Sequence, residues 1–279
     1  MTTEIDETLN IASYIAKAVE RLDDRNIRGV EDYLPTGIGD LDVMIGGLHR
    51  KSVTLLGGCT GSGKTAMVIR ILANISRETI KKYRVGYLSN AFSLDLFAEH
   101  LIIHCAQVES VKIRDGEMND ADWCRIWEIA DKLCHAGIFP SVIDGLDFDQ
   151  VCDRVIAMVE DNGLDLVIVD GYDHLPSEAV RKLKLLAEKF NVAILVTCSI
   201  SEKPNLENRF PILSDFDENK GLIRTADVVT MLYRANYYFD NIKPDATVTQ
   251  LLVAKNYFGR TGIVNFRFDW QRYDFLDMK

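Results

Sequence analysis

The stretch that decides the fold reads Gly58-Cys59-Thr60-Gly61-Ser62-Gly63-Lys64-Thr65, and it matches the pattern GxxxxGK[ST] at every position. The apolar run at 52–56 precedes it and predicts a buried strand, and Ala66-Met67-Val68-Ile69 continues it as a helix. Glycines allow the backbone to wrap closely around an anion, so that amide N–H groups point at phosphate oxygens. The start of the following helix adds positive potential. These residues therefore predict a phosphate-binding loop.

The chemistry of such a loop predicts that it binds ATP and Mg²⁺. Lys64 would place its compact charge on the β and γ phosphates, and the Thr65 hydroxyl would ligate the magnesium ion. A matching acid should end a buried strand, and the run at 164–169 ends in Asp170, which would hold the magnesium shell through water. The predicted nucleotide contacts are Gly58, Thr60, Gly61, Ser62, Gly63, Lys64, Thr65 and Ala66.

Beyond the loop, apolar strands alternate with helical segments. We expect strands near 85–88, 138–143, 166–169, 192–197 and 228–233, helices near 64–78, 94–106, 120–135, 148–161 and 177–190, and a terminal strand pair at 247–254 and 262–268. Apolar strands separated by helices predict an α/β fold with a mostly parallel, twisted sheet covered by helices on both faces. We assign this domain to residues 30–279.

The first 29 residues have a different pattern. Apolar side chains recur at helical spacing over residues 8–22 and predict an amphipathic helix. The polar residues 23–29 are typical of a linker. The helix either packs on its own domain or forms an arm that docks on a neighbouring subunit.

Composition limits the class of protein. The chain has 279 residues, of which 47% are hydrophobic and 27% are charged, as in an ordinary soluble protein. It has no apolar run of about 18 residues, and its first residues are acidic and polar, so we expect a cytoplasmic protein without a membrane span. The six scattered cysteines predict free thiols. A net charge of −10 argues against electrostatic coating of duplex DNA, but a local groove or an oligomeric pore could still hold nucleic acid.

Several motifs together resemble the C-terminal motor domain of bacterial replicative helicases of the DnaB type, a RecA-like family. The resemblance covers roughly residues 30–279. The motifs are Leu34-Pro35-Thr36-Gly37-Ile38-Gly39-Asp40-Leu41-Asp42 with Gly46-Gly47-Leu48, Asp115-Gly116-Glu117-Met118-Asn119-Asp120-Ala121-Asp122-Trp123, Gly163-Leu164-Asp165, Pro211-Ile212-Leu213-Ser214-Asp215, Ala226-Asp227-Val228-Val229, Leu232-Tyr233-Arg234, Ala254-Lys255-Asn256 and Gly259-Arg260-Thr261-Gly262.

This resemblance implies a RecA-like P-loop fold and ATP-driven translocation on single-stranded DNA in DNA replication. It also implies a homo-oligomer, either a ring or a filament, and a replication-protein partner. The family's N-terminal domain, which supports primase binding and ring assembly, has no counterpart in this sequence, so we expect a standalone motor domain. The helix at 8–22 lies where the family has a linker helix that clips onto the next subunit.

Positions that serve hydrolysis in the family are altered here. Counting back from Gly116 without gaps places Ala91 where the family has a glutamate that orients the attacking water. A rival alignment with about four residues of slippage would make Asp95 the base, and both alignments remain open. Ser199 stands where the family has a glutamine that senses the γ-phosphate. Of a lysine and an arginine that the family offers to the neighbour's ATP, Lys255 is present and Tyr257 replaces the arginine.

The segments that contact DNA in the family also differ. The loop after Asp170 is short, and the loop at 201–220 mixes Lys203, Arg209 and Lys220 with acidic residues. Asp217 lies about where the family has a basic contact, and Tyr237 and Tyr238 could stack on bases. Two hypotheses follow from these departures. The first is an ATP-hydrolysing helicase motor. The alternative is a catalytically weakened ATP-binding accessory or regulatory module of a replication or recombination complex.

Overall fold

The computed structural model describes residues 11–28, 32–77, 82–90, 93–171, 176, 178–207, 209–234 and 248–278. The chain divides into two compact units, residues 1–32 and residues 33–279. We describe each unit by itself.

The first unit contains helix α1 (Ile11–Arg28), which is longer than the sequence predicts. Residues 23–28, predicted to be a linker, are helical, because the sequence has no glycine or proline before Gly29 to end the helix. The helix exposes a set of large apolar side chains at helical spacing: Ile11, Tyr14, Ile15, Val19 and Leu22.

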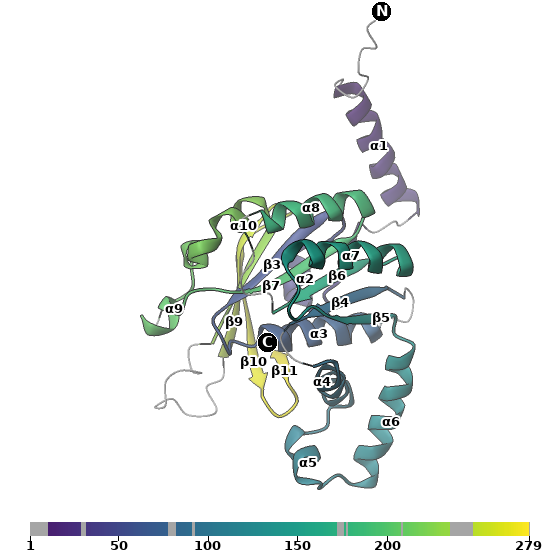
Figure 1. Cartoon of the computed structure of the whole chain (residues 1–279), viewed down its shortest axis with the longest axis vertical. Coiled ribbons are helices and arrows are strands. Elements are labelled where there is room, and N and C mark those ends of the chain that lie inside the picture. The colour runs from purple at the N-terminus through teal and green to yellow at the C-terminus, as the bar shows by residue number, and fades with distance from the viewer. Residues whose placement is uncertain are drawn as a thin grey trace, which may run out of the picture. The chain divides into compact units, whose positions relative to one another are not determined.

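The second unit is built on a nine-stranded sheet within the described residues, in the order β11-β10-β9-β8-β3-β7-β6-β4-β5 (Figure 1). Adjacent strands from β8 through β3, β7, β6 and β4 to β5 are parallel, whereas β9, β10 and β11 are antiparallel. The prediction of a mostly parallel sheet is confirmed, and the short strand β11 was not predicted. The bounds are β3 Ser52–Gly58, β4 Val85–Ser89, β5 Ile138–Val142, β6 Leu166–Asp170, β7 Ala193–Ser199, β8 Val228–Tyr233, β9 Val248–Asn256, β10 Gly262–Asp269 and β11 Asp274–Asp277.

Helices cover both faces of the sheet, as predicted (Figure 1). One face carries α2 (Gly39–Ile45), α3 (Lys64–Arg77) and α4 (Leu94–Ala106), and α6 (Asp120–Cys134) packs against α4. The other face carries α7 (Phe148–Asn162), α8 (Ala179–Phe190) and α10 (Lys220–Thr225), next to the 3₁₀ helix η2 (Leu213–Asn219). The remaining short elements are β1 Tyr33–Leu34, β2 Leu48–His49, α5 Ser110–Asp115 and α9 Lys203–Leu206.

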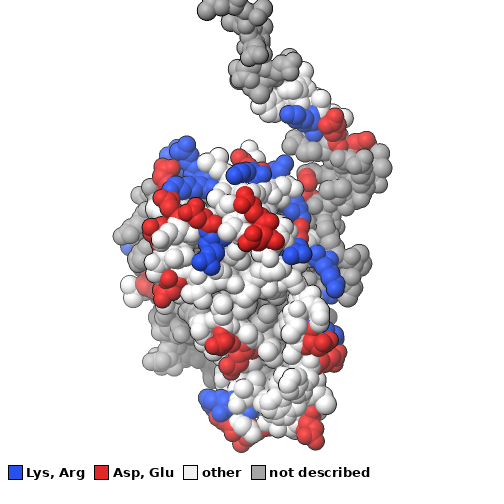
Figure 2. Space-filling model, turned by 45° about the vertical axis from the view of Figure 1, so that its right-hand side comes forward, with Lys and Arg blue, Asp and Glu red and all other residues white. Residues whose placement is uncertain are grey.

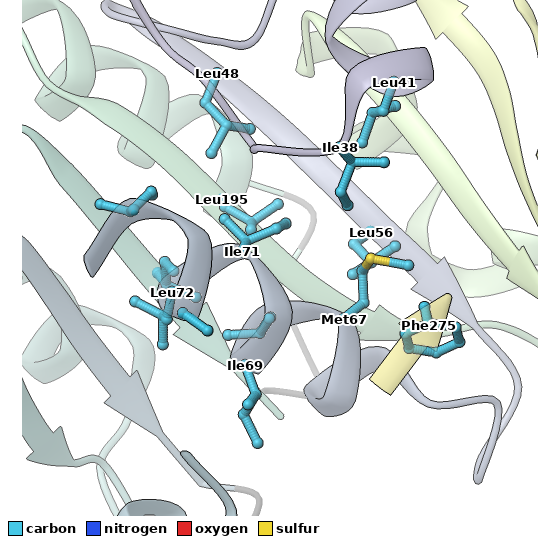
Figure 3. Packing of buried hydrophobic residues seen from close by; sticks show 14 of the residues in the cluster. Ile38, Leu41, Leu48, Leu56, Met67, Ile69, Ile71, Leu72, Leu195 and Phe275 are labelled. Carbon is cyan, nitrogen blue, oxygen red and sulfur yellow. The ribbon is translucent and has the colours of Figure 1, made fainter. Parts of the chain in front are cut away.

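Alternation along β3 creates two hydrophobic cores. Val53 and Leu55 belong to the core beneath α7 and α8, whereas Leu56 belongs to the core beneath α3. Figure 3 shows Met67 and Ile71 of α3 next to strand side chains, among them Leu56. Met67, Ile69 and Leu72 are at most 1% exposed. This burial fixes α3 against the sheet and therefore holds the first turn of α3 at the carboxyl end of β3.

The surface carries charges of both signs. On the face drawn in Figure 2, acidic and basic side chains are interspersed and a broad uncharged area lies between them. Across the described ranges, no helix is both long and apolar enough to cross a membrane. All six cysteines are free thiols, which confirms that prediction.

Candidate nucleotide-binding site

The loop between β3 and α3 is a tight turn that requires glycine. Gly63 has a φ of 102°, and a Cβ atom added there would lie 2.8 Å from Cζ of Phe275. A Cβ atom on Gly58 would lie 2.4 Å from Oγ of Ser62. The Ser62 hydroxyl is buried and has no hydrogen-bond partner among the residues that the structure describes. A buried hydroxyl without a partner inside such a loop fits an acceptor supplied from outside the chain.

Lys64 begins α3 and bends back over the loop. Its ammonium group donates to the carbonyl oxygens of Gly58 at 2.8 Å and Cys59 at 3.2 Å, and to the Ser199 hydroxyl at 3.2 Å. Ser199 ends β7, which lies beside β3 in the sheet. The structure therefore places the compact positive charge at the centre of the loop, in contact with the residue at the predicted sensor position.

Asp170 ends β6 and is fully buried. Its carboxylate accepts hydrogen bonds from the Thr197 hydroxyl at 2.6 Å, from the Tyr87 hydroxyl at 3.0 Å and from Thr65. Burial raises the pKa of Asp170, and these donors together with the Lys64 ammonium act in the opposite direction. The structure brings Lys64, Thr65 and Asp170 together, as the sequence motifs predict.

This group of side chains fits a magnesium ion. Mg²⁺ prefers hard oxygen ligands and usually keeps several waters. A buried carboxylate beside the Thr65 hydroxyl supplies such oxygens, and the carboxylate is held in position by two further hydroxyl groups. The donor set therefore suits the ion that the loop motif implies.

Sequence reasoning missed Tyr87 and Thr197, which hold Asp170. Both lie in strands that flank β6, near the carboxyl ends of those strands. Burial raises the pKa of Tyr87, and the neighbouring Asp170 charge raises it further. A polar side chain in an otherwise apolar strand was the signal that could have found each of them.

The two alternatives for the water-orienting position are not equally visible. Ala91 lies outside the described residues, and so do the loop residues 172–175 and Tyr237 and Tyr238. Asp95 lies in the first turn of α4 and is exposed, and the Ser93 hydroxyl caps that helix by accepting from the Leu96 amide.

Lys255 lies away from the loop in this subunit. It pairs with Val229 near the amino end of β8, whereas Gly58 pairs with Leu232 toward the carboxyl end of the same strand. Its ammonium donates to the carbonyl oxygens of Ile223 at 2.9 Å, Arg224 at 3.1 Å and Ala226 at 2.5 Å. Lys255 thus caps the carboxyl end of α10, and burial lowers the pKa of its ammonium.

Two neighbouring predictions concern the segments beyond the strands. Tyr257, at the position of the family's arginine, is 80% exposed. Arg209, one of the cations in the loop at 201–220, forms a two-pronged ion pair with buried Asp215, with N–O distances of 2.8 and 2.7 Å. The guanidinium is therefore engaged within the chain. The side chain of Asp217 lies outside the described residues.

Comparison with known proteins identifies the family. The family model described as "DnaB-like helicase C terminal domain" matches residues 33–277. The chain is 30% identical to a probable replicative DNA helicase of Trieres chinensis over 88% of this chain. It is 23% identical to the replicative DNA helicase DnaC of Bacillus subtilis (strain 168) over 97% of this chain. The matches span 57% and 62% of those relatives, which is less than two thirds of either.

Two solved structures share the fold. One is an isolated ATPase domain, which superposes with a TM-score of 0.82 and 21% identity, covering 97% of this chain and 99% of that one. A DnaB-like replicative helicase, solved in a study of its interactions with primase, gives a TM-score of 0.79 and 21% identity, covering 94% of this chain and 66% of that one. With a family model that matches from Tyr33 to Asp277 and a fold that agrees with it, this chain belongs to the DnaB-like helicase C-terminal domain family, a RecA-like group of P-loop proteins.

Proposed function

We propose that this chain binds ATP with Mg²⁺ in the β3–α3 loop and uses it to drive translocation on single-stranded DNA during DNA replication. One observation carries the proposal. Lys64, Thr65 and buried Asp170 meet at the loop of a chain that belongs to a replicative helicase family. Fold likeness alone would not be enough, because one fold supports many functions.

Each residue has a distinct part in binding. The loop amides and the start of α3 face the phosphates, and Lys64 exchanges its contacts with the Gly58 and Cys59 carbonyl oxygens for phosphate oxygens. Thr65 and Asp170 hold the magnesium ion, which neutralises phosphate charge and orients the triphosphate when bound. Tyr87 and Thr197 position Asp170 without touching the nucleotide.

Hydrolysis requires groups beyond those that bind. A base must orient the water, and positive charge must reach the transition state. Ungapped alignment puts Ala91 at the first position, and an alanine cannot polarise water. Lys255, the proposed contribution to a neighbour's site, is capping α10 in this subunit. These observations favour a second candidate function, in which the chain is a catalytically weakened ATP-binding module of a replication or recombination complex.

Assembly is part of the proposal. We propose that the chain forms a ring or filament of identical subunits and that α1 is the arm that docks on a neighbour. Five large apolar side chains of α1 are between 56% and 69% exposed within the described chain. Burial of such side chains favours association at about 25 cal/mol per Å² of apolar surface. A replication-protein partner and single-stranded DNA complete the proposed set of partners.

Replacement of Lys64 tests the site itself. Lys64→Ala removes a charge-assisted donor to phosphate, each such bond contributing about 1.5–3 kcal/mol, so we expect ATP affinity to fall at least about tenfold. Isothermal titration calorimetry with Mg·ATP measures this. The control is Lys189→Ala, at an exposed position in the last turn of α8. Equal affinity in Lys64→Ala and the wild type would refute the assigned site.

Replacement of Asp170 tests the magnesium ligand. Asp170→Asn keeps the shape of the side chain and removes its charge. We expect the wild type to bind ATP more tightly with Mg²⁺ than with EDTA, and the variant to lose that difference. The matched control is Asp149→Asn, where an exposed carboxylate pairs with Lys182. A magnesium effect of normal size in Asp170→Asn would contradict the proposed role.

Steady-state ATP turnover, measured with and without single-stranded DNA, separates the two candidate functions. A motor should turn over ATP faster when DNA is present, whereas tight ATP binding with negligible turnover would identify the binding module. Asp95→Ala should leave turnover unchanged if Ala91 occupies the water-orienting position, because Asp95 is then only an exposed residue of α4. A strong loss of turnover in Asp95→Ala would establish the rival alignment.

A charge placed on α1 tests the docking arm. Ile15→Glu puts a carboxylate into the exposed apolar stripe, so we expect it to reduce the assembly seen by light scattering in the presence of ATP. Lys17→Glu adds a carboxylate at an exposed position of the same helix and should leave assembly intact. A wild-type chain that stays monomeric with ATP would exclude the arm and the role of Lys255 on a neighbour's nucleotide.

A further inference from the structure

A carboxylate of this chain already sits on the phosphate-binding loop. The backbone N–H of Thr60 donates to Oε1 of Glu202 at 3.0 Å. Glu202 lies three residues after Ser199, just beyond the end of β7. A carboxylate and a phosphate are both anionic acceptors, so they compete for the same amide.

Two further bonds fix the segment around Glu202 to the loop. The Ile200 amide donates to the Gly58 carbonyl oxygen at 3.3 Å, and the Cys59 thiol donates to the Ser201 carbonyl oxygen at 3.4 Å. Burial raises the pKa of the Cys59 thiol to about 11, and the negative charge of Glu202 acts in the same direction. The charge of Glu202 is therefore felt inside the loop.

The same segment continues into the loop at 201–220. The Ser201 amide donates to the Asp215 carbonyl oxygen at 2.9 Å, and the buried Asp215 carboxylate holds Arg209 and the Ile212 amide. A displacement of residues 200–202 is thus transmitted directly to Asp215 and its partners.

We propose that Glu202 is a gate on the nucleotide site. Its carboxylate occupies the Thr60 amide when no nucleotide is bound, and an entering triphosphate displaces it by competition for the amide and by repulsion between like charges. Departure of Glu202 frees residues 200–202 from the β3–α3 loop and so reports nucleotide binding to the segment that Asp215 organises. The proposal rests on the proposed nucleotide-binding function and adds its regulation.

The expected size of the effect follows from competition. A site that is closed part of the time binds with an affinity reduced by the fraction that is open. Because the contact between Glu202 and Thr60 is exposed to solvent, we expect the gate to weaken binding by only about threefold to tenfold, and less at high salt, where the repulsion is screened.

The test measures the affinity for the non-hydrolysable ATP analogue AMP-PNP with Mg²⁺ by calorimetry in the wild-type chain and two variants. Glu202→Gln removes the charge, and Glu202→Ala removes both the charge and the acceptor. Both should bind about threefold to tenfold more tightly than the wild type, and the gain should shrink as salt rises. The matched control is Glu207→Gln, which removes one charge from the same segment where the carboxylate pairs with Arg209.

A second measurement follows the segment itself. Hydrogen exchange of the amides of residues 200–202 should become faster when AMP-PNP is added to the wild type, and Glu202→Ala should exchange faster even without it. Affinity of Glu202→Gln equal to that of Glu207→Gln, or unchanged exchange on adding nucleotide to a wild type that binds it, overturns the gate alone. Reduced turnover with unchanged affinity places Glu202 in hydrolysis and also overturns the gate. Absence of binding in every variant removes the proposed function together with the gate.

Discussion

The attachment of α3 to the sheet is the constraint on which the rest of the second unit depends. Met67 and Leu72 are buried against the strands, and Gly63 lets the loop approach the ring of Phe275 more closely than any other residue would allow. Because this packing is dense, the loop cannot move independently of β3 and β11. The orientation of the loop amides and of Lys64 is therefore a consequence of the hydrophobic core rather than of the loop residues alone.

The same packing makes a buried charge tolerable. A carboxylate at the end of a buried strand loses its hydration, and only well-placed donors offset that loss. Asp170 receives hydroxyl donors from Tyr87 on one flanking strand and Thr197 on the other, and Lys64 contributes a nearby positive charge. The strand order places β6 between β4 and β7, so the topology of the sheet supplies these partners. A change at Tyr87 or Thr197 would consequently act on the magnesium site without touching the nucleotide.

Local patterns were sufficient to predict much of this arrangement. The loop motif is contiguous, and Asp170 follows an apolar run directly, so both could be located without knowledge of strand order. The parallel sheet followed from the alternation of apolar strands and helices. Tyr87 and Thr197 could not be recognised in the same way, because their role depends on which strands lie beside β6. Likewise, the cap that Lys255 provides for α10 joins segments far apart in the sequence, and no spacing rule predicts it. The extension of α1 to Arg28 was missed because charged residues were given more weight than the absence of a helix breaker.

The contacts of the loop suggest how binding and motion are linked in such a site. The loop satisfies several of its own polar groups within the chain. Lys64 donates to the Gly58 carbonyl oxygen, and the Thr60 amide donates to Glu202. A triphosphate can enter only by replacing contacts of this kind, so part of its binding energy is used to break them, and the groups released belong to segments outside the loop. Ser199 and Glu202 both follow from β7, which means that the carboxyl end of one strand receives both displacements. Nucleotide binding is thereby coupled to the segment beyond β7 through the exchange of hydrogen bonds, and this coupling requires no catalytic group.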